Sequence, residues 1–396
     1  AGIADEPDDK NGLAHLVEHL MFRGTSNRNS IQIARFMDEA GGQMGGFITR
    51  DYTCFSATVL DDYRTFAIDL LGDILLNSLY SCEDIEREKR TILQEIETIY
   101  DTPDQRTDQN LKSYIWNNHY LGKSVNGYPE MVSKLTRDDV VEFVEKNYLA
   151  DRIIIAAAGN VDHQDFVAQV QDAFWRMDGI SSCRMRSVPQ FFSGVTVEYL
   201  SVSQVYFSIG IRALAYNHPC RYDVHIANKI LGGGISSRLF RHIREERGLV
   251  YDISSEYHAY QDDGVIVIEA STSPEYFMEV INLTLTEIYN LFNGNKPIDE
   301  EELWKAKMQI RGQHLISSEN SNTLMSRLVT QELYFAAHIS SDEILGAIDN
   351  IDLKSMKNVF KILQPTLKNR AIAVIGPHVP EYYDQAMIEA LWAKFN

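Results

Sequence analysis

The 396-residue chain carries 37 Lys plus Arg against 56 Asp plus Glu, a formal net charge of −19, and 44% of its residues are hydrophobic. These proportions exclude a disordered chain, a collagen-like repeat and a small disulfide scaffold, and the length predicts two or three domains. The acidic balance disfavours nucleic acid and anionic membranes as partners and favours basic peptides. The sequence contains no 18-residue apolar run that would span a membrane, and its four cysteines lack the CxxC spacing of a zinc knuckle or redox motif.

Apolar periodicity divides the first half of the chain into helices and strands. Residues 13–22 (LAHLVEHLMF), 62–79 and 84–100 have the apolar spacing of helices, and residues 53–60 (TCFSATVL) are rich in β-forming side chains. The apolar run at 152–158 (RIIIAAA) predicts a short central strand.

The second half of the chain repeats this plan. The stretch that begins at Leu239 can be laid over the stretch that begins at Ile33, because both run as a helix, a glycine turn and two strands. Residues 370–379 (RAIAVIGPHV) likewise match 152–162 (RIIIAAAGNVD). A single repeat at this long offset predicts two homologous α/β domains rather than a solenoid. We expect an N-terminal domain at 1–180, a linker at 181–194 and a C-terminal domain at 195–396.

The helix at 13–22 carries the strongest chemical signal. Its only polar residues are His15, Glu18 and His19, whose spacings of three and four place them on one face of a helix that is otherwise apolar. Two core histidines bonded to Glu18 would be the structural interpretation. Burying three ionisable groups costs several kcal/mol without a partner, and two imidazoles at i and i+4 can converge on one divalent ion. This H-x-x-E-H pattern is the inverzincin signature and predicts a zinc site.

A hydrolytic zinc site needs a third protein ligand and an open position for water. The helix at 84–100 offers several acidic residues, and Glu88 and Glu95 share a face because they lie seven residues apart. The spacing alone does not choose among the acids of this helix, which are Asp84, Glu86, Glu88, Glu95 and Glu97.

With these motifs, the sequence resembles the pitrilysin/insulinase family of metallopeptidases, in particular the short-chain branch that includes mitochondrial processing peptidase and its bacterial relatives. The resemblance covers essentially the whole chain. It implies an α+β fold in which each of the two domains is a mainly antiparallel sheet packed by helices. It also implies that Glu95, 76 residues past His19 in the patch ILQEIE, is the third zinc ligand, and that Glu88 supports the site.

A second family motif lies in the C-terminal domain. The segment SSRLFRHIREERGLVY at 236–251 resembles the family segment with an arginine and a tyrosine seven residues apart, which match Arg244 and Tyr251. The resemblance implies that both contact substrate near the scissile bond. Without it, Arg244 would be interpreted as a surface charge and Tyr251 as a strand aromatic.

Three features depart from the family pattern. The chain begins 14 residues before His15, so we expect the first strand or two of the N-terminal domain to be missing. Gly45-Gly46 replace the usual Asn-Ala of the substrate-binding strand, which removes one side-chain hydrogen bond to substrate. Gln105 and Gln109 stand where presequence-processing members have two acids, and the adjacent Asp104 and Asp108 are rotated by about 100° on a helix, which disfavours presequence processing.

Together, the residues and the resemblance predict a zinc endopeptidase that hydrolyses peptides or unfolded polypeptide segments. We expect one Zn²⁺ per chain, held by His15, His19 and Glu95, with Glu18 as the general base for the attacking water. Arg244 and Tyr251 are expected to steady the substrate carbonyl, and the peptide to bind as an added strand along 45–58.

The alternative is a non-catalytic core or partner subunit of the same fold, which the intact metal motif disfavours. Because one chain carries both the metal motif and the Arg/Tyr motif, we expect a homodimer that pairs them between subunits, rather than a heterodimer. The sequence favours a soluble protein of the bacterial cytoplasm or periplasm over one of the mitochondrial matrix. It does not name the physiological substrate.

Overall fold

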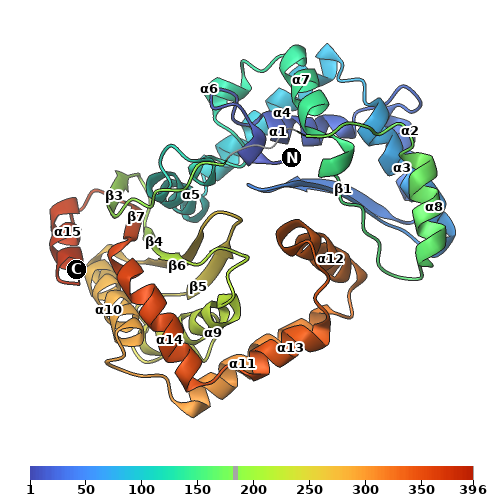
Figure 1. The fold of residues 1–396 in the computed structure, drawn as a ribbon. Helices are drawn as coiled ribbons and strands as arrows, with labels where there is room; N and C mark the ends of the chain where they lie inside the picture. Colours follow the sequence, from blue (N-terminus) through green and yellow to red (C-terminus); the bar gives the residue numbers. More distant parts are fainter. Residues whose placement is uncertain (182–185, 396) are drawn as a thin grey trace. The chain divides into compact units, whose positions relative to one another are not determined.

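A computed structural model describes residues 1–181 and 186–395 of the chain (Figure 1). These residues form two compact units. Unit 1 comprises Ala1–Thr98, Lys123–Arg186 and Ser318–Leu333, and unit 2 comprises Ile99–Gly122, Ser187–Ser317 and Tyr334–Asn396. Within the described ranges, no helix is both long enough and apolar enough to cross a membrane.

Unit 1 is mainly helical. Its elements are η1 (Ile3–Asp5), α1 (Leu13–Met21), α2 (Ser30–Glu39), β1 (Gln43–Ile48), β2 (Thr53–Thr58), η2 (Asp61–Tyr63), α3 (Arg64–Asn77), α4 (Cys82–Tyr100), α6 (Pro129–Val132), α7 (Arg137–Asn147), η4 (Ala150–Arg152), α8 (His163–Ala173) and α12 (Ser321–Phe335). The last two residues of α4 and of α12 are assigned to unit 2. The sequence predictions of a helix at 13–22, a strand within 53–60 and helices at 62–79 and 84–100 are confirmed.

The core of unit 1 forms where α1 packs among α4, α6 and α7. Leu16, Val17 and Leu20 of α1 are fully buried against apolar residues of the other helices, including Ile92 of α4 and Phe143 of α7. Strands β1 and β2 pair antiparallel, with Gly46 opposite Phe55. This packing places the polar face of α1 next to α4 and β1.

Unit 2 contains a five-stranded sheet in the order β3-β7-β4-β6-β5. Strands β3 and β7 run parallel, and the other neighbouring pairs run antiparallel. Its elements are α5 (Pro103–Ile115), η3 (Tyr120–Gly122), β3 (Gly194–Tyr199), β4 (Val205–Ala213), α9 (Arg221–Leu231), η5 (Phe240–Glu245), β5 (Ile253–Ala259), β6 (Gly264–Thr272), α10 (Pro274–Phe292), α11 (Glu300–Ser317), α13 (Ser341–Asp349), α14 (Leu353–Leu363), η6 (Gln364–Lys368), β7 (Arg370–Gly376) and α15 (Gln385–Ala393). The predicted α+β class with mostly antiparallel sheets is confirmed.

Helices cover both faces of the sheet in unit 2. Ile372 and Val374 of β7 face the core formed with α9, α10 and α14, whereas Ala371 and Ala373 face α5 (Figure 1). Burial on both faces explains why β7 reads as a continuous apolar run in the sequence.

The predicted central strand at 152–158 is wrong. The chain forms the short helix η4 at Ala150–Arg152, and residues 153–158 belong to no strand. In unit 2, the matching segment β7 lies between β3 and β4. No strand of the described part of unit 1 flanks 153–158 in this way, and Ile154 and Ile155 are each 37% exposed. An apolar run becomes a strand only where neighbouring strands satisfy its backbone.

Candidate metal centre

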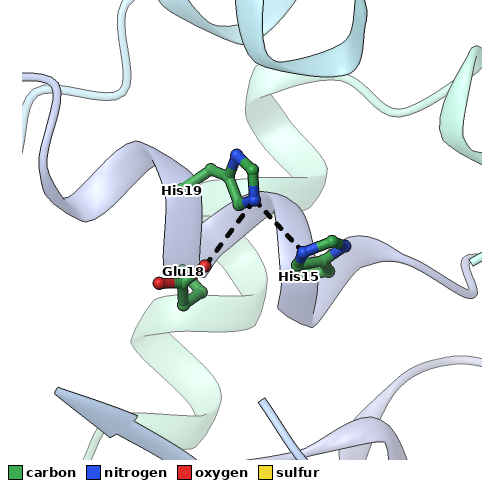
Figure 2. A group of neighbouring side chains, drawn as sticks. All are labelled: His15, Glu18 and His19. Atoms are coloured by element: carbon green, nitrogen blue, oxygen red, sulfur yellow. Dashed lines mark hydrogen bonds and ion pairs between the residues drawn. The ribbon is translucent and has the colours of Figure 1, made fainter. Parts of the chain in front are cut away.

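Helix α1 presents three ionisable side chains on one face. His15 and Glu18 are buried, and the side chain of His19 is 16% exposed. The Nε2 atoms of the two histidines lie 3.1 Å apart, and Oε2 of Glu18 lies 3.8 Å from Nε2 of His19. Figure 2 shows the three side chains meeting beside the helix. The structure therefore brings together the residues of the H-x-x-E-H motif.

Helix α4 adds two carboxylates to this group. The oxygens of Glu95 lie 3.6 Å from Nε2 of His15 and 3.8 Å from Nε2 of His19. Oε2 of Glu88, which is completely buried, accepts a hydrogen bond from Nδ1 of His19 at 3.1 Å. Glu88 and Glu95 reach the same group because seven residues make almost two helical turns.

Arg23 extends the network to a residue that the sequence analysis missed. Its Nε lies 2.6 Å from Oε1 of Glu88, in an ion pair whose angles are not those of a hydrogen bond. Arg23 thus compensates the charge of a carboxylate that would otherwise be costly to bury. Its place four residues after His19, in the series His15–His19–Arg23, is the sequence signal that could have indicated it.

The donor atoms of this group fit a zinc ion. Glu88 only accepts hydrogen bonds when ionised, so His19 donates from Nδ1 and presents the lone pair of Nε2 toward His15. In tetrahedral zinc sites, Zn–N bonds of 2.0–2.1 Å place two ligand nitrogens about 3.3 Å apart. The separation of 3.1 Å between the two Nε2 atoms is close to that value. The carboxylate of Glu95, whose side chain is 41% exposed, faces both nitrogens.

Burial keeps the ring of His15 neutral. Burial, helped by the neighbouring His19, lowers the pKa of His15 to about 4, although the backbone of Asn126 acts in the opposite direction. His15 is therefore ready to bind metal at neutral pH, since only the unprotonated ring is a ligand. Burial also raises the pKa of Glu18, and the nearby carboxylates of Glu95 and Glu88 add to this effect against the influence of His19. A raised pKa suits a carboxylate that must accept and return a proton.

Strand β1 approaches Glu18 more closely than a side chain would allow. A Cβ atom added to Gly46 would lie 2.2 Å from Oε1 of Glu18, whereas a Cβ atom on Gly45 would meet nothing within 4 Å. The two glycines thus differ. Gly46 leaves room for the Glu18 carboxylate, and Gly45 faces open space on the other side of the strand.

The second predicted pair, Arg244 and Tyr251, lies in unit 2. The guanidinium of Arg244 stacks over Phe240 at 4.5 Å from the ring centroid and lies 5.6 Å from the centroid of Tyr251. Arg244 belongs to η5, a π-helical turn, and π-helical turns frequently mark functional sites. Tyr251 is 83% exposed. The structure therefore pairs these two residues with each other on the surface of their own unit.

Comparisons with protein families agree with this geometry. The model of the insulinase family, peptidase family M16, matches residues 1–128, which include the candidate metal-site residues on α1 and α4. The model described as the peptidase M16 inactive domain matches residues 134–310, which include Arg244 and Tyr251.

Similar proteins extend the likeness over the whole chain. An uncharacterized zinc protease of Mycobacterium tuberculosis is 32% identical over 384 residues, covering 95% of this chain and 86% of the relative. The uncharacterized zinc protease YmxG of Bacillus subtilis is 29% identical over 376 residues, covering 95% of this chain and 91% of the relative. Among solved structures, a peptidase M16 inactive domain from Pseudomonas fluorescens (TM-score 0.88, 19% identity, 96% of this chain and 91% of the other) and a protease from Helicobacter pylori (TM-score 0.86, 17% identity, 95% and 92%) share the fold. The chain therefore belongs to the insulinase family of peptidases, family M16.

Proposed function

We propose that the protein is a zinc-dependent endopeptidase that cleaves peptides or unfolded polypeptide segments. The observation that carries this proposal is the convergence of two imidazole nitrogens 3.1 Å apart with the carboxylate of Glu95, next to a further buried carboxylate, Glu18. His15, His19 and Glu95 would hold one Zn²⁺, and Glu18 remains free to act on the substrate side. The family membership and the names of the relatives as zinc proteases support the same conclusion.

Each side chain near the proposed zinc site would have a separate role in hydrolysis. Zinc, when bound, supplies Lewis-acid chemistry that polarises a scissile carbonyl and acidifies water. Glu18 takes the proton of the attacking water and later delivers it to the leaving amine. Glu88 holds the ring of His19 in the tautomer whose Nε2 faces the metal, and Arg23 balances the charge of Glu88.

The peptide itself would be bound by backbone and by unit 2 residues. An extended peptide can add to the edge of β1, where pairing depends on the backbone because Gly45 and Gly46 offer no side chain. Arg244 and Tyr251 would donate hydrogen bonds to the substrate carbonyl near the bond that breaks. We propose further that two copies of the chain form a homodimer in which this pair serves the metal centre of the other subunit.

Zinc content and peptide cleavage test the proposal together. We expect one zinc per chain, cleavage of a quenched-fluorescent basic peptide, loss of cleavage on chelation and recovery on adding zinc. Glu18→Gln is the matched variant, because it keeps the shape of the side chain but cannot accept the proton. It should retain zinc and lose at least about 10²-fold in kcat.

Two outcomes would contradict the proposal. Native chain that binds zinc but leaves a library of unfolded peptides uncut would favour the non-catalytic partner role. Near-native cleavage by the zinc-loaded Glu18→Gln variant would remove Glu18 from the mechanism.

A further inference from the structure

Glu6 is a buried acid that the catalytic scheme does not use. It is 3% exposed, and its Oε1 accepts hydrogen bonds from the backbone N–H groups of Gly12 at 3.1 Å and Ala14 at 2.8 Å. Its Oε2 accepts a hydrogen bond from Nδ2 of Asn11 at 2.8 Å. The three donors belong to the first turn of α1 or to the two residues before it.

Glu6 supplies the cap that α1 lacks locally. The N-cap residue Gly12 has a φ of 99° and no side chain to accept from the first turn. The first N–H groups of a helix have no partner within the helix, and a negative charge near them is favourable. Glu6 supplies the missing acceptor from six residues upstream. Burial raises the pKa of this carboxyl to about 7, against the hydrogen bonds that favour its ionised form.

The residues that precede α1 also contact the loop at 124–127. Nδ2 of Asn11 also donates to the backbone oxygen of Ser124 at 3.1 Å. A Cβ atom on Gly127 would lie 2.6 Å from Cα of Gly12, so the loop and the start of α1 touch through their backbones. Asn126 lies between these contacts, and its backbone acts to raise the pKa of His15, although Nδ1 of His15 is buried without a hydrogen-bond partner.

We propose that Glu6 is a positioning residue for the metal centre. Its carboxylate, together with Asn11, holds the first turn of α1 and the loop at 124–127 in register, and so fixes the ring of His15 for metal binding. Ala14, which Glu6 binds, directly precedes His15, so a shift of this turn moves the ligand. The proposal rests on the proposed zinc site, and it is tested first without zinc.

Amide hydrogen exchange and zinc affinity give two separate measurements on the full chain. In chelated protein, Glu6→Ala should speed exchange at Gly12 and Ala14, which the carboxylate protects. Zinc affinity, measured by competition with a chelating dye, should fall about 10- to 100-fold, the range found for residues that orient metal ligands. Glu6→Gln should recover the slow exchange, because its Oε1 still accepts from the two N–H groups. It should recover only part of the zinc affinity, because turning Oδ1 of Asn11 toward the new amide gives up the hydrogen bond from Nδ2 of Asn11 to Ser124.

Asp162→Ala is the matched control. Asp162 caps α8 by accepting from the backbone N–H of Asp165 at 3.0 Å, far along the chain from the metal motif. Its loss should lower stability with a change of less than about twofold in zinc affinity. If Glu6→Ala does not fold, Asn11→Ala decides, with an expected severalfold loss of zinc affinity and faster exchange in the first turn of α1.

The outcomes are distinguishable from failure of the proposed function. Folded Glu6→Ala or Asn11→Ala with native exchange and native zinc affinity would overturn the proposal, as would a Glu6→Gln variant that loses as much as Glu6→Ala. An equal loss of zinc affinity in Asp162→Ala would also overturn it. A native chain that binds no zinc would contradict the proposed function. The exchange measurement would still test whether Glu6 holds the first turn of α1.

Discussion

At the scale of single residues, the carboxylate of Glu18 occupies space that only a glycine leaves open in β1. A Cβ atom on Gly46 would lie 2.2 Å from Oε1 of Glu18. The carboxylate is the flexible end of a side chain, so it can move aside without unfolding the strand. The proposed general base, Glu18, therefore depends on Gly46 for its position.

We predict that Gly46→Ala keeps zinc but lowers kcat about 10- to 100-fold, because a displacement of about 1 Å in a reacting group costs that much. Zinc content and steady-state kinetics check this prediction. Gly45→Ala is the comparison, since it adds the same methyl group to the same strand but meets no atom within 4 Å. Any effect of Gly45→Ala should appear in KM, because this residue lies on the proposed substrate strand. An equal fall in kcat for both variants would refute the special role of Gly46.

A second prediction at this scale concerns pH. Burial raises the pKa of Glu6 from 4.5 to about 7, so between these values the folded chain holds a proton that the unfolded chain has released. This contribution to stability is complete below pH 4.5 and is lost as the pH rises through about 7. In chelated protein, the urea midpoint of the native chain should therefore fall relative to that of Glu6→Gln between pH 5 and pH 8. Parallel midpoints over this range would contradict it.

The sequence predicts some of these residues and not others for a physical reason. His15, Glu18 and His19 are close in space because they share one helix, and helical periodicity is visible in the sequence. Glu6 reaches α1 through an irregular turn, and Arg23, which follows the end of α1, meets Glu88 of α4. Both contacts depend on tertiary packing. The spacing of Arg23 from His19 could indicate that Arg23 lies near the site, but it does not identify Glu88 as its partner.

At the scale of elements, the orientation of α4 determines which of its acidic residues lie near the histidines of α1. The spacing left several acids open, and only the family resemblance singled out Glu95. In the structure, the apolar residues Ile85, Ile92 and Ile96 turn one face of α4 toward α1. Glu88 and Glu95 lie beside this face, whereas Glu97 is exposed.

Glu95→Gln should weaken zinc binding by removing a ligand charge, and Glu97→Gln should leave it unchanged. Glu97 follows Glu95 by two residues, so it is rotated by about 200° around the helix and points away from the histidines. Zinc affinity of the two folded variants, measured side by side with a competing chelator, checks the prediction. Equal affinities would exclude Glu95 as the third ligand.

The failed strand at 152–158 shows what an element needs besides its own residues. Its apolar composition matches that of β7, yet β7 pairs on both edges and is covered by helices on both faces. Residues 153–158 are only partly covered, and two of the isoleucines are more than a third exposed. Periodicity therefore predicted where apolar side chains concentrate, whereas strand formation depended on neighbours distant in the sequence.

At the scale of the whole molecule, the two chemical motifs lie in different units. The segments that match in sequence are α2-β1-β2 in unit 1 and η5-β5-β6 in unit 2. The metal motif is in unit 1, on α1 and α4, and the Arg/Tyr pair is in unit 2, on η5 and just before β5. A subunit that always worked with a specialised partner would not need both motifs, which is why we propose a homodimer.

Mixing two inactive chains tests this arrangement. Glu18→Gln lacks the general base but has an intact Arg244, and Arg244→Ala has an intact metal centre. If the sites are shared between subunits, a mixed dimer contains one site with Glu18 and Arg244 both intact and one with neither. Random re-pairing of equal amounts makes half of the dimers mixed, so we expect activity to recover to about one quarter of the native value. A mixture of Glu18→Gln with the double variant should stay inactive, because no mixed site then has both residues. No recovery, with subunit exchange demonstrated by labelled chains, would show that each chain uses its own Arg244 or none.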